Sequence, residues 1–323
     1  MEASKRGSLT VVITLLLAAV VGIFSGILTA KSITNKTPYT IHRYAIILII
    51  TIYCMLFVPA AGAVSSRSSP KTIIITGTGS SIGTTELMAK DFQKKRPQAK
   101  VRVLPSIGST GSIRAVREEK IDIGLSARPL KPEERSEGII EEPYGITAFI
   151  FGVQSSNPTT GFTLAEIEEI YAGKRRTWPD GTPIRLILRP RSDAYSVYLE
   201  NINPGMKSAS TQAHSVPGVF VGSTEQEAAV QIEKTPGSFG TISGAVITSE
   251  KRKIKALCVD GTAPTRANII AGKYPYKITL SLVYKKDKYK GLIEDFIEFV
   301  FSRAGQKILS NNGHVTLPRR TGK

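Results

Sequence analysis

The sequence predicts an α/β fold for the chain after residue 64. Short runs of β-branched residues alternate there with segments whose apolar residues recur at helical spacing, which is typical of alternating strands and helices. Three successive predicted strands also end in turns of glycine, serine and threonine. The chain has 323 residues, 41% of them apolar, which is enough for one large core or two smaller ones.

The first of these units begins with a predicted strand at Thr72–Thr76 and continues into a predicted helix at Thr84–Arg96. The turn between them reads "GTGSSIG" and contains Ser80 and Ser81. In a parallel sheet such a turn lies at the carboxyl end of its strand, where ligands of α/β folds bind.

Two further units repeat this order. A strand at Val101–Leu104 precedes the turn "PSIGSTGSI" and a helix, and a strand at Ile121–Leu125 precedes "SARP". The polar candidates in these two units are Ser109, Thr110, Gly111, Asp122 and Ser126.

Farther along, a helix is predicted from Thr163 to Gly173, and residues 184–201 read as a strand, a polar turn and a helix. Ser223 is predicted to start another helix with a capping box. Residues 291–309 are predicted to form one apolar-periodic final helix.

The first turn fits three kinds of site. A dinucleotide-binding loop expects an acidic residue at the end of the second strand, and none occurs there. A nucleophile elbow (Gly79 to Gly83 fits G-x-S-x-G) belongs on a central strand, whereas no strand is predicted before this one. An anion cradle needs only helix N-termini and hydroxyl donors, which three such turns supply. Arg189 adds a planar fork suited to a tetrahedral oxyanion, so the cradle is favoured.

Charge and composition agree with an anionic ligand. The formal net charge is +17, and residues 64–323 carry 38 Lys and Arg against 25 Asp and Glu. A basic surface attracts anions of any size. Nucleic acid is disfavoured because the basic residues are dispersed without a recognisable binding motif. The three histidines are scattered, which disfavours a metal site.

Two uncharged apolar segments, 11–30 and 45–63, precede the α/β part. The second resembles a secretory signal with an A-x-A pattern that ends at Ala63, and a short linker follows at 64–69. The alternative is a two-helix membrane hairpin that stays attached. Either interpretation predicts export.

The order of motifs "TGTGSSIG", "SIGSTGSI", "DIGLSARPL", "GSFGTIS" and "YPYKITLSLVY" resembles that of phosphate-binding proteins of bacterial ABC importers. The resemblance covers about residues 70–318 and marks a divergent branch of the periplasmic solute-binding superfamily. It implies a two-lobed fold with the ligand in the cleft. The first lobe would comprise 70–145 plus 245–323 and the second 146–244, with crossing segments at 145–153 and 237–243.

The resemblance also implies the ligand and the partners. The ligand would be inorganic phosphate or a similar oxyanion, delivered to an ABC permease by a monomer that needs no cofactor, metal or catalytic residue. The residues carried over as ligand-binding are Ser80, Ser81, Ser109, Thr110, Gly111, Asp122, Ser126, Arg189, Ser192 and Asp193.

The last loop departs from the family pattern, because Ser192-Asp193-Ala194 stands where the family has Ser-Gly-Thr. Asp193 has three interpretations: it accepts the proton of a hydrogen-phosphate, it repels anions so that the ligand is something else, or it is a helix N-cap that points to solvent. The predicted function is an extracytoplasmic binding protein rather than an enzyme. The alternative is a membrane-tethered sensor or interaction domain of the same fold.

Overall fold

The computed structural model describes residues 72–135 and 138–319. The apolar segments 11–30 and 45–63 and the linker lie outside these residues. Among the residues that the structure describes, no helix has both the length and the apolar character that crossing a bilayer requires.

A parallel sheet forms the centre of the first lobe, as predicted. β1 (Thr72–Gly77) pairs in parallel with both β2 (Lys100–Val103) and β3 (Ile123–Ser126). The connections are α3 (Gly79–Lys95) and α4 (Gly108–Arg117). The carboxyl ends of the three strands therefore lie at one edge of the sheet.

The helix α3 begins at Gly79, so the predicted start at Thr84 was wrong. Glycines and serines in the turn suggested a loop, yet every residue from Gly79 to Thr85 is buried against the rest of the protein. The "GSSIG" turn is thus itself the first turn of the helix, and tertiary packing overrides the weak helix propensity of these residues.

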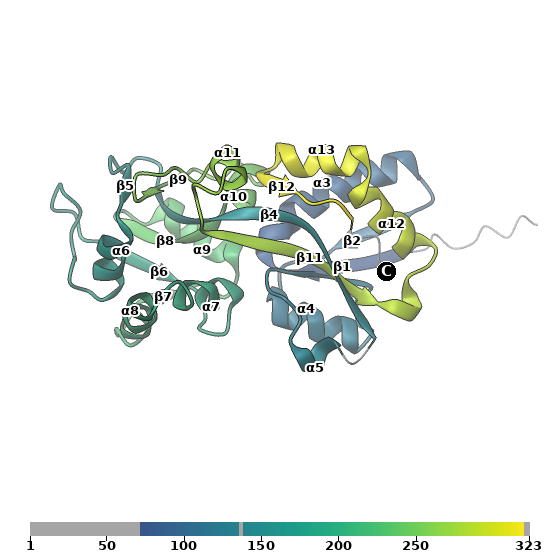
Figure 1. Cartoon of the computed structure of the whole chain (residues 1–323), viewed down its shortest axis with the longest axis horizontal. Helices are drawn as coiled ribbons and strands as arrows, with labels where there is room; N and C mark the ends of the chain where they lie inside the picture. The colour runs from purple at the N-terminus through teal and green to yellow at the C-terminus, as the bar shows by residue number, and fades with distance from the viewer. Residues whose placement is uncertain (1–71, 136–137, 320–323) are drawn as a thin grey trace, which may run out of the picture. The chain divides into compact units, whose positions relative to one another are not determined.

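One long strand, β4 (Ile139–Gln154), belongs to both lobes (Figure 1). Residues 139–148 pair with the antiparallel strand β11 (Lys277–Lys285), and residues 149–153 pair with β8 (Ser238–Ser243). The main path of the sheet is β2-β1-β3-β11-β4-β8-β6-β7, in which β6 is Arg185–Leu188 and β7 is Phe220–Val221. The segment predicted to cross at 145–153 lies within β4. The segment predicted to cross at 237–243 contains β8, which pairs with residues 149–153 of β4 and with β6.

The second lobe repeats the parallel arrangement. β6 (Arg185–Leu188) lies between the parallel strands β8 and β7 (Phe220–Val221). The predicted helix at 163–173 is α6, and its capping box joins Thr163 and Glu166. The helices of this lobe are α6 (Leu164–Tyr171), α7 (Ala194–Glu200), α8 (Pro204–His214) and α9 (Glu225–Lys234).

The predicted lobe boundary needs one correction. β9 (Ile254–Ala256) pairs with the end of β4, and β10 (Cys258–Val259) pairs with β5 (Gly161–Phe162). This segment was predicted in the first lobe but pairs with second-lobe strands, because the chain returns there after α10 (Gly244–Ser249). The remaining elements are α5 (Pro132–Arg135), α11 (Arg266–Ile270), the 3-10 turn Lys286–Lys288 and β12 (His314–Thr316).

The single helix predicted at 291–309 is two helices, α12 (Leu292–Phe301) and α13 (Arg303–Asn311). Ser302 separates them, and its hydroxyl accepts a hydrogen bond from the Gly305 backbone N–H at 3.3 Å. A serine N-cap of this kind ends the apolar periodicity of one helix and starts the next.

Aromatic side chains anchor the core on both sides of the cleft. In the first lobe, Phe92 meets Phe296 and Phe299 edge to face, with ring centroids 5.3 and 5.5 Å away. In the second lobe, Phe239 packs against Phe151 with ring centroids 5.9 Å apart. These packed cores fix the strand ends that carry the polar groups described next.

Candidate functional site

A cavity of about 130 Å³ lies between the start of α4 in the first lobe and the loop after β6 in the second. This volume is below the range of pockets that hold drug-sized ligands, so the cavity suits a small ion. It brings together five residues predicted for the site from separate parts of the sequence. They are Ser109, Thr110, Gly111, Ser192 and Asp193.

The N-terminus of α4 opens into this cavity without a side-chain cap. Its N-cap residue is Ile107, whose apolar side chain cannot accept from the first N–H groups. The Gly108 N–H donates to the Ser106 Oγ at a long 3.4 Å. The other N–H groups of the first turn and the positive end of the helix dipole therefore face the cavity. Such a terminus favours an anion.

Hydroxyl groups fix α4 to the end of β3. The Ser109 Oγ accepts from the Ala127 N–H at 2.9 Å, and the Ser112 Oγ donates to the Leu125 carbonyl at 3.0 Å. Ser126 is fully buried, and its Oγ donates to the Arg128 carbonyl at 2.7 Å. Ser126 thus shapes its own loop, next to the cavity-lining Ser109.

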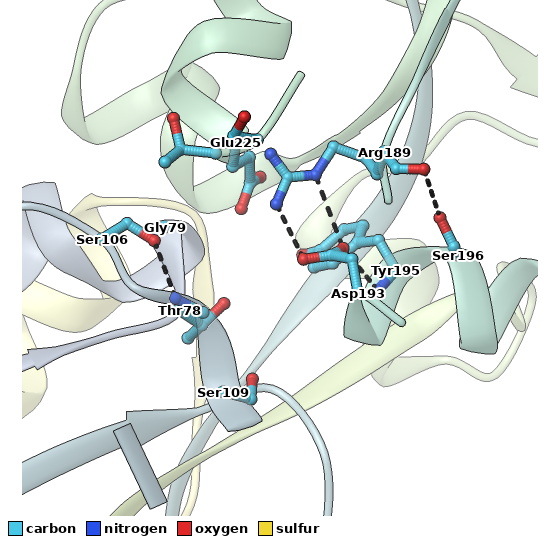
Figure 2. Close-up of polar contacts among 12 residues, drawn as sticks. Thr78, Gly79, Ser106, Ser109, Arg189, Asp193, Tyr195, Ser196 and Glu225 are labelled. Atoms are coloured by element: carbon cyan, nitrogen blue, oxygen red, sulfur yellow. Dashed lines mark hydrogen bonds and ion pairs between the residues drawn. The ribbon is translucent and has the colours of Figure 1, made fainter. Parts of the chain in front are cut away.

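Arg189 follows β6 directly, and Figure 2 shows its guanidinium group beside Asp193. The Arg189 side chain is only 5% exposed. Its Nη2 donates to Asp193 Oδ2 at 2.8 Å, while Asp193 Oδ1 accepts from the Tyr195 N–H at 3.0 Å. Asp193 is therefore the N-cap of α7 and also orients the arginine. The interpretation of Asp193 as an N-cap that points to solvent was wrong in its second part, because the side chain is only 13% exposed and pairs with Arg189. The Arg189 Nη1 is buried and has no hydrogen-bond partner among the described residues.

Ser80 connects the two lobes. Its Oγ donates to Glu225 Oε2 at 2.6 Å and lies 2.9 Å from the Tyr195 hydroxyl. Because Ser80 has one proton and Glu225 accepts it, Tyr195 acts as the donor to Ser80. A second contact between the lobes runs from the Gln226 Nε2 to the Gly79 carbonyl at 3.1 Å.

Two predicted residues lie apart from this cluster. Ser81 is fully buried, and its Oγ accepts from the Tyr144 hydroxyl at 2.6 Å. Asp122 immediately precedes β3, at the end opposite Ser126, and its Oδ2 accepts from the Ile74 N–H at 2.7 Å. The structure therefore does not bring Asp122 to the cleft, because a strand separates it from the carboxyl edge of the sheet.

Burial shifts the pKa values of two side chains in the cleft, Glu225 and Tyr195. Burial raises the pKa of Glu225, although the hydrogen bonds from Ser80 and Ser243 and the positive charge of Arg189 oppose this rise. Burial also raises the pKa of Tyr195 well above its ordinary value, and the nearby Glu225 charge adds to the effect. Tyr195 therefore remains a hydroxyl donor at any physiological pH.

Sequence reasoning missed three residues of the site. Glu225 was placed in a capping box starting at Ser223, but the N-cap is Thr224 and Glu225 points into the cleft. Tyr195 was not singled out, nor was Arg128, whose Nη2 lies 3.4 Å from Thr110 Oγ1. The position of Glu225 after the parallel strand β7 was the available signal.

The comparisons agree with this architecture. A family model described as a PBP superfamily domain matches residues 63–304. The chain is 28% identical over 298 residues to protein SphX of Synechococcus elongatus, covering 82% of this chain and 85% of that protein. It is 24% identical over 234 residues to the phosphate-binding protein PstS of Bacillus subtilis, covering 70% and 74%.

Two solved structures show the same fold. A Clostridium perfringens protein, described as a phosphate ABC transporter substrate-binding protein with bound phosphate, superposes with a TM-score of 0.66 at 22% identity. It covers 76% of this chain and all of that one. An ABC-type phosphate transport receptor from Vibrio cholerae gives 0.55 at 20% identity, covering 77% and 100%. Together with the family match across most of its length, these findings establish that the chain belongs to the PBP superfamily.

Proposed function

We propose that this protein is an extracytoplasmic solute-binding protein that captures phosphate, or a related tetrahedral oxyanion, between its lobes. An ABC permease would then receive the anion. The lobes supply complementary donors, so a closed cleft surrounds the ligand with bonds that neither lobe provides alone.

The observation that carries this proposal is the unpartnered Nη1 of Arg189. A buried guanidinium nitrogen without an acceptor is costly, and an oxyanion would supply the acceptor. The uncapped start of α4 and the hydroxyls of Ser109, Thr110 and Ser192 lie around the adjoining cavity. All of these groups donate hydrogen bonds.

Asp193 gives a reason to prefer phosphate over sulfate. Its carboxylate lines the cavity and can accept a proton from hydrogen-phosphate, whereas fully ionised sulfate has no proton to give. In this proposal Asp193 therefore has two tasks, because it also holds Arg189.

The relatives support the same ligand class and transport role. PstS of Bacillus subtilis is named a phosphate-binding protein, and the Clostridium perfringens and Vibrio cholerae structures are described as parts of phosphate ABC transport. The signal-like pattern that ends at Ala63 supports export of this chain.

The test is calorimetric titration of the purified full chain with phosphate, comparing Arg189→Ala with Arg191→Ala. Arg191 is a matched control because it carries the same charge two residues away with its side chain 53% exposed. The Arg189 variant should lose at least about 100-fold in affinity, since it removes a charge-assisted donor pair. The Arg191 variant should bind like the wild type.

Thermal unfolding of both variants checks that they fold. Equal phosphate affinity in the wild type and a folded Arg189→Ala variant would remove Arg189 from the site and contradict the proposed cleft.

A further inference from the structure

Glu225 is the first residue of α9, and its side chain is buried in the cleft with only 2% of the residue exposed. One carboxylate oxygen, Oε1, accepts from the Ser243 N–H at 2.7 Å within the second lobe. The other, Oε2, accepts from the Ser80 hydroxyl of the first lobe at 2.6 Å. The carboxylate is thus anchored in one lobe and reaches across to the other.

The groups that Glu225 engages are anion-binding groups. Ser80 lies in the first turn of α3, where hydroxyl and N–H donors favour an anion. Figure 2 shows the Arg189 guanidinium between the Glu225 side chain and Asp193. The charge of Arg189 also stabilises ionised Glu225, which opposes the effect of burial. Glu225 therefore uses the donors that an oxyanion would need.

The charges of the side chains around Glu225 oppose the entry of a second anion. The single positive charge of Arg189 faces two carboxylates, Asp193 at 2.8 Å and Glu225. Tyr195 contributes a neutral hydroxyl beside Ser80, and Ser243 contributes a backbone N–H. With Glu225 ionised, an incoming anion meets more negative than positive charge among these side chains.

We infer that Glu225 is an internal competitor for the proposed oxyanion: its carboxylate must leave Ser80 before the anion can use both Ser80 and Arg189. This inference rests on the proposed function and concerns the regulation of the same site. Neutralising Glu225 should strengthen anion binding and should weaken the link that holds the lobes together through Ser80.

The competition should depend on pH, because a protonated Glu225 no longer carries the competing charge. The groups that face it are Ser80 from α3, Tyr195 from α7, Arg189 after β6 and Ser243 at the end of β8. The imidazole of His214 lies farther back, with its Nε2 2.9 Å from the Arg189 carbonyl oxygen. A ratio of wild-type and variant affinities cancels the titration of phosphate itself.

The experiment is calorimetric titration of the full chain with inorganic phosphate, comparing wild type, Glu225→Gln and Glu118→Gln. Glutamine keeps an acceptor for Ser243 and removes the charge. Glu118 is an exposed carboxylate at the far end of α4, so its variant controls for net charge. We expect Glu225→Gln to bind phosphate about tenfold more tightly at a pH where Glu225 is ionised, with a gain that shrinks as the pH falls and Glu225 becomes protonated. Glu118→Gln should match the wild type.

Weaker or unchanged phosphate binding by a folded Glu225→Gln variant, with clear binding by the wild type, overturns the competitor role and leaves the proposed function standing. A gain that does not change with pH also overturns it. If neither protein binds phosphate at any pH, the proposed function itself fails and the inference fails with it. If the variant does not fold, amide hydrogen exchange of the wild type supplies the test. Saturating phosphate should speed exchange of the backbone amides at the α9 N-terminus, because Glu225 leaves Ser80. Increased protection of these amides contradicts displacement.

Discussion

His314 is a neutral histidine that is fully buried in the core beside Thr84, with its Nε2 3.0 Å from the threonine hydroxyl oxygen. Burial lowers its pKa to about 4 from an ordinary value of 6.5. Its Nδ1 has no hydrogen-bond partner among the described residues. The folded protein therefore holds the imidazole in its neutral form, whereas acid favours the protonated form.

This burial predicts acid sensitivity. The unfolded chain protonates His314 below about pH 6.5 and the folded chain only near pH 4, so the unfolding free energy falls as the pH drops through this window. The full effect is about 3 kcal/mol. Urea unfolding of the wild type and of His314→Gln between these pH values measures it. The variant should show a shallower loss of stability, and equal slopes would contradict the assignment.

Residue types in the cleft were predictable, but their contacts were not. Ser80, Ser109, Arg189 and Asp193 could be found because small polar residues after strands and an arginine after β6 are local signals. The bond from Ser80 to Glu225 joins residues 145 positions apart, which no local pattern encodes. Sequence reasoning therefore placed Glu225 only within a predicted capping box that starts at Ser223, and gave it no role in the site.

At the scale of elements, the approach of α3 to α9 depends on a glycine. A Cβ built on Gly79 would lie 2.6 Å from the Glu225 Cβ and 2.7 Å from the Gln226 Oε1. Gly79 also offers its carbonyl to Gln226. The absence of a side chain at Gly79 thus permits the helix termini of the two lobes to meet.

Gly79→Ala should keep these termini apart. The added methyl group should weaken phosphate binding about tenfold or more, because the cleft can no longer close around the ligand. Gly244→Ala is a suitable control, since a Cβ there would lie at an ordinary 3.5 Å from Ala148 Cβ. Calorimetric titration of both variants tests this, and unaffected affinity in Gly79→Ala would show that this contact is not needed for binding.

Gly77 is the first glycine of the turn that resembles a nucleotide-binding loop, and close packing of two strands requires it there. A Cβ on Gly77 would lie 2.0 Å from the Leu125 carbonyl oxygen, so Gly77 allows β1 and β3 to pack at the edge of the cleft. Gly77→Ala should lower the unfolding free energy by about 1–3 kcal/mol or more through overpacking. Urea unfolding measures the change, and a variant as stable as the wild type would contradict this close-packing account.

The predictions of helices and strands were right where a local pattern of apolar residues marks the element. They were wrong where tertiary packing determines where a helix begins or ends. β1 follows from a β-branched run, and α6 and β6 follow from their local apolar patterns. The capping box predicted at Ser223 was wrong, because the N-cap of α9 is Thr224. The early start of α3 depends on burial of small residues, which lowers the value of propensity as a guide. The break at Ser302 depends on its hydroxyl, which caps α13. The pairing of β9 and β10 with strands of the second lobe could not be predicted, because the sequence of a two- or three-residue strand does not indicate its pairing partner.

The whole molecule is basic. The chain carries a formal net charge of +17, and most of the excess lies after residue 63. A field of this sign raises the rate at which small anions reach the protein and is screened by salt. The association rate for phosphate should therefore fall several-fold between about 0.01 and 0.5 M NaCl, with a smaller change in dissociation. Stopped-flow measurements test this, and a salt-independent association rate would contradict electrostatic steering.

The central claim is that the cleft captures a tetrahedral oxyanion, and titration of the full chain with phosphate and then sulfate tests it most directly. The chain is first freed of bound anion by unfolding and refolding. We predict one site with micromolar or tighter phosphate affinity and much weaker sulfate binding, since a Kd near 1 μM corresponds to about 8 kcal/mol. Absence of heat with phosphate, when the refolded chain is native by its thermal transition, would contradict the account.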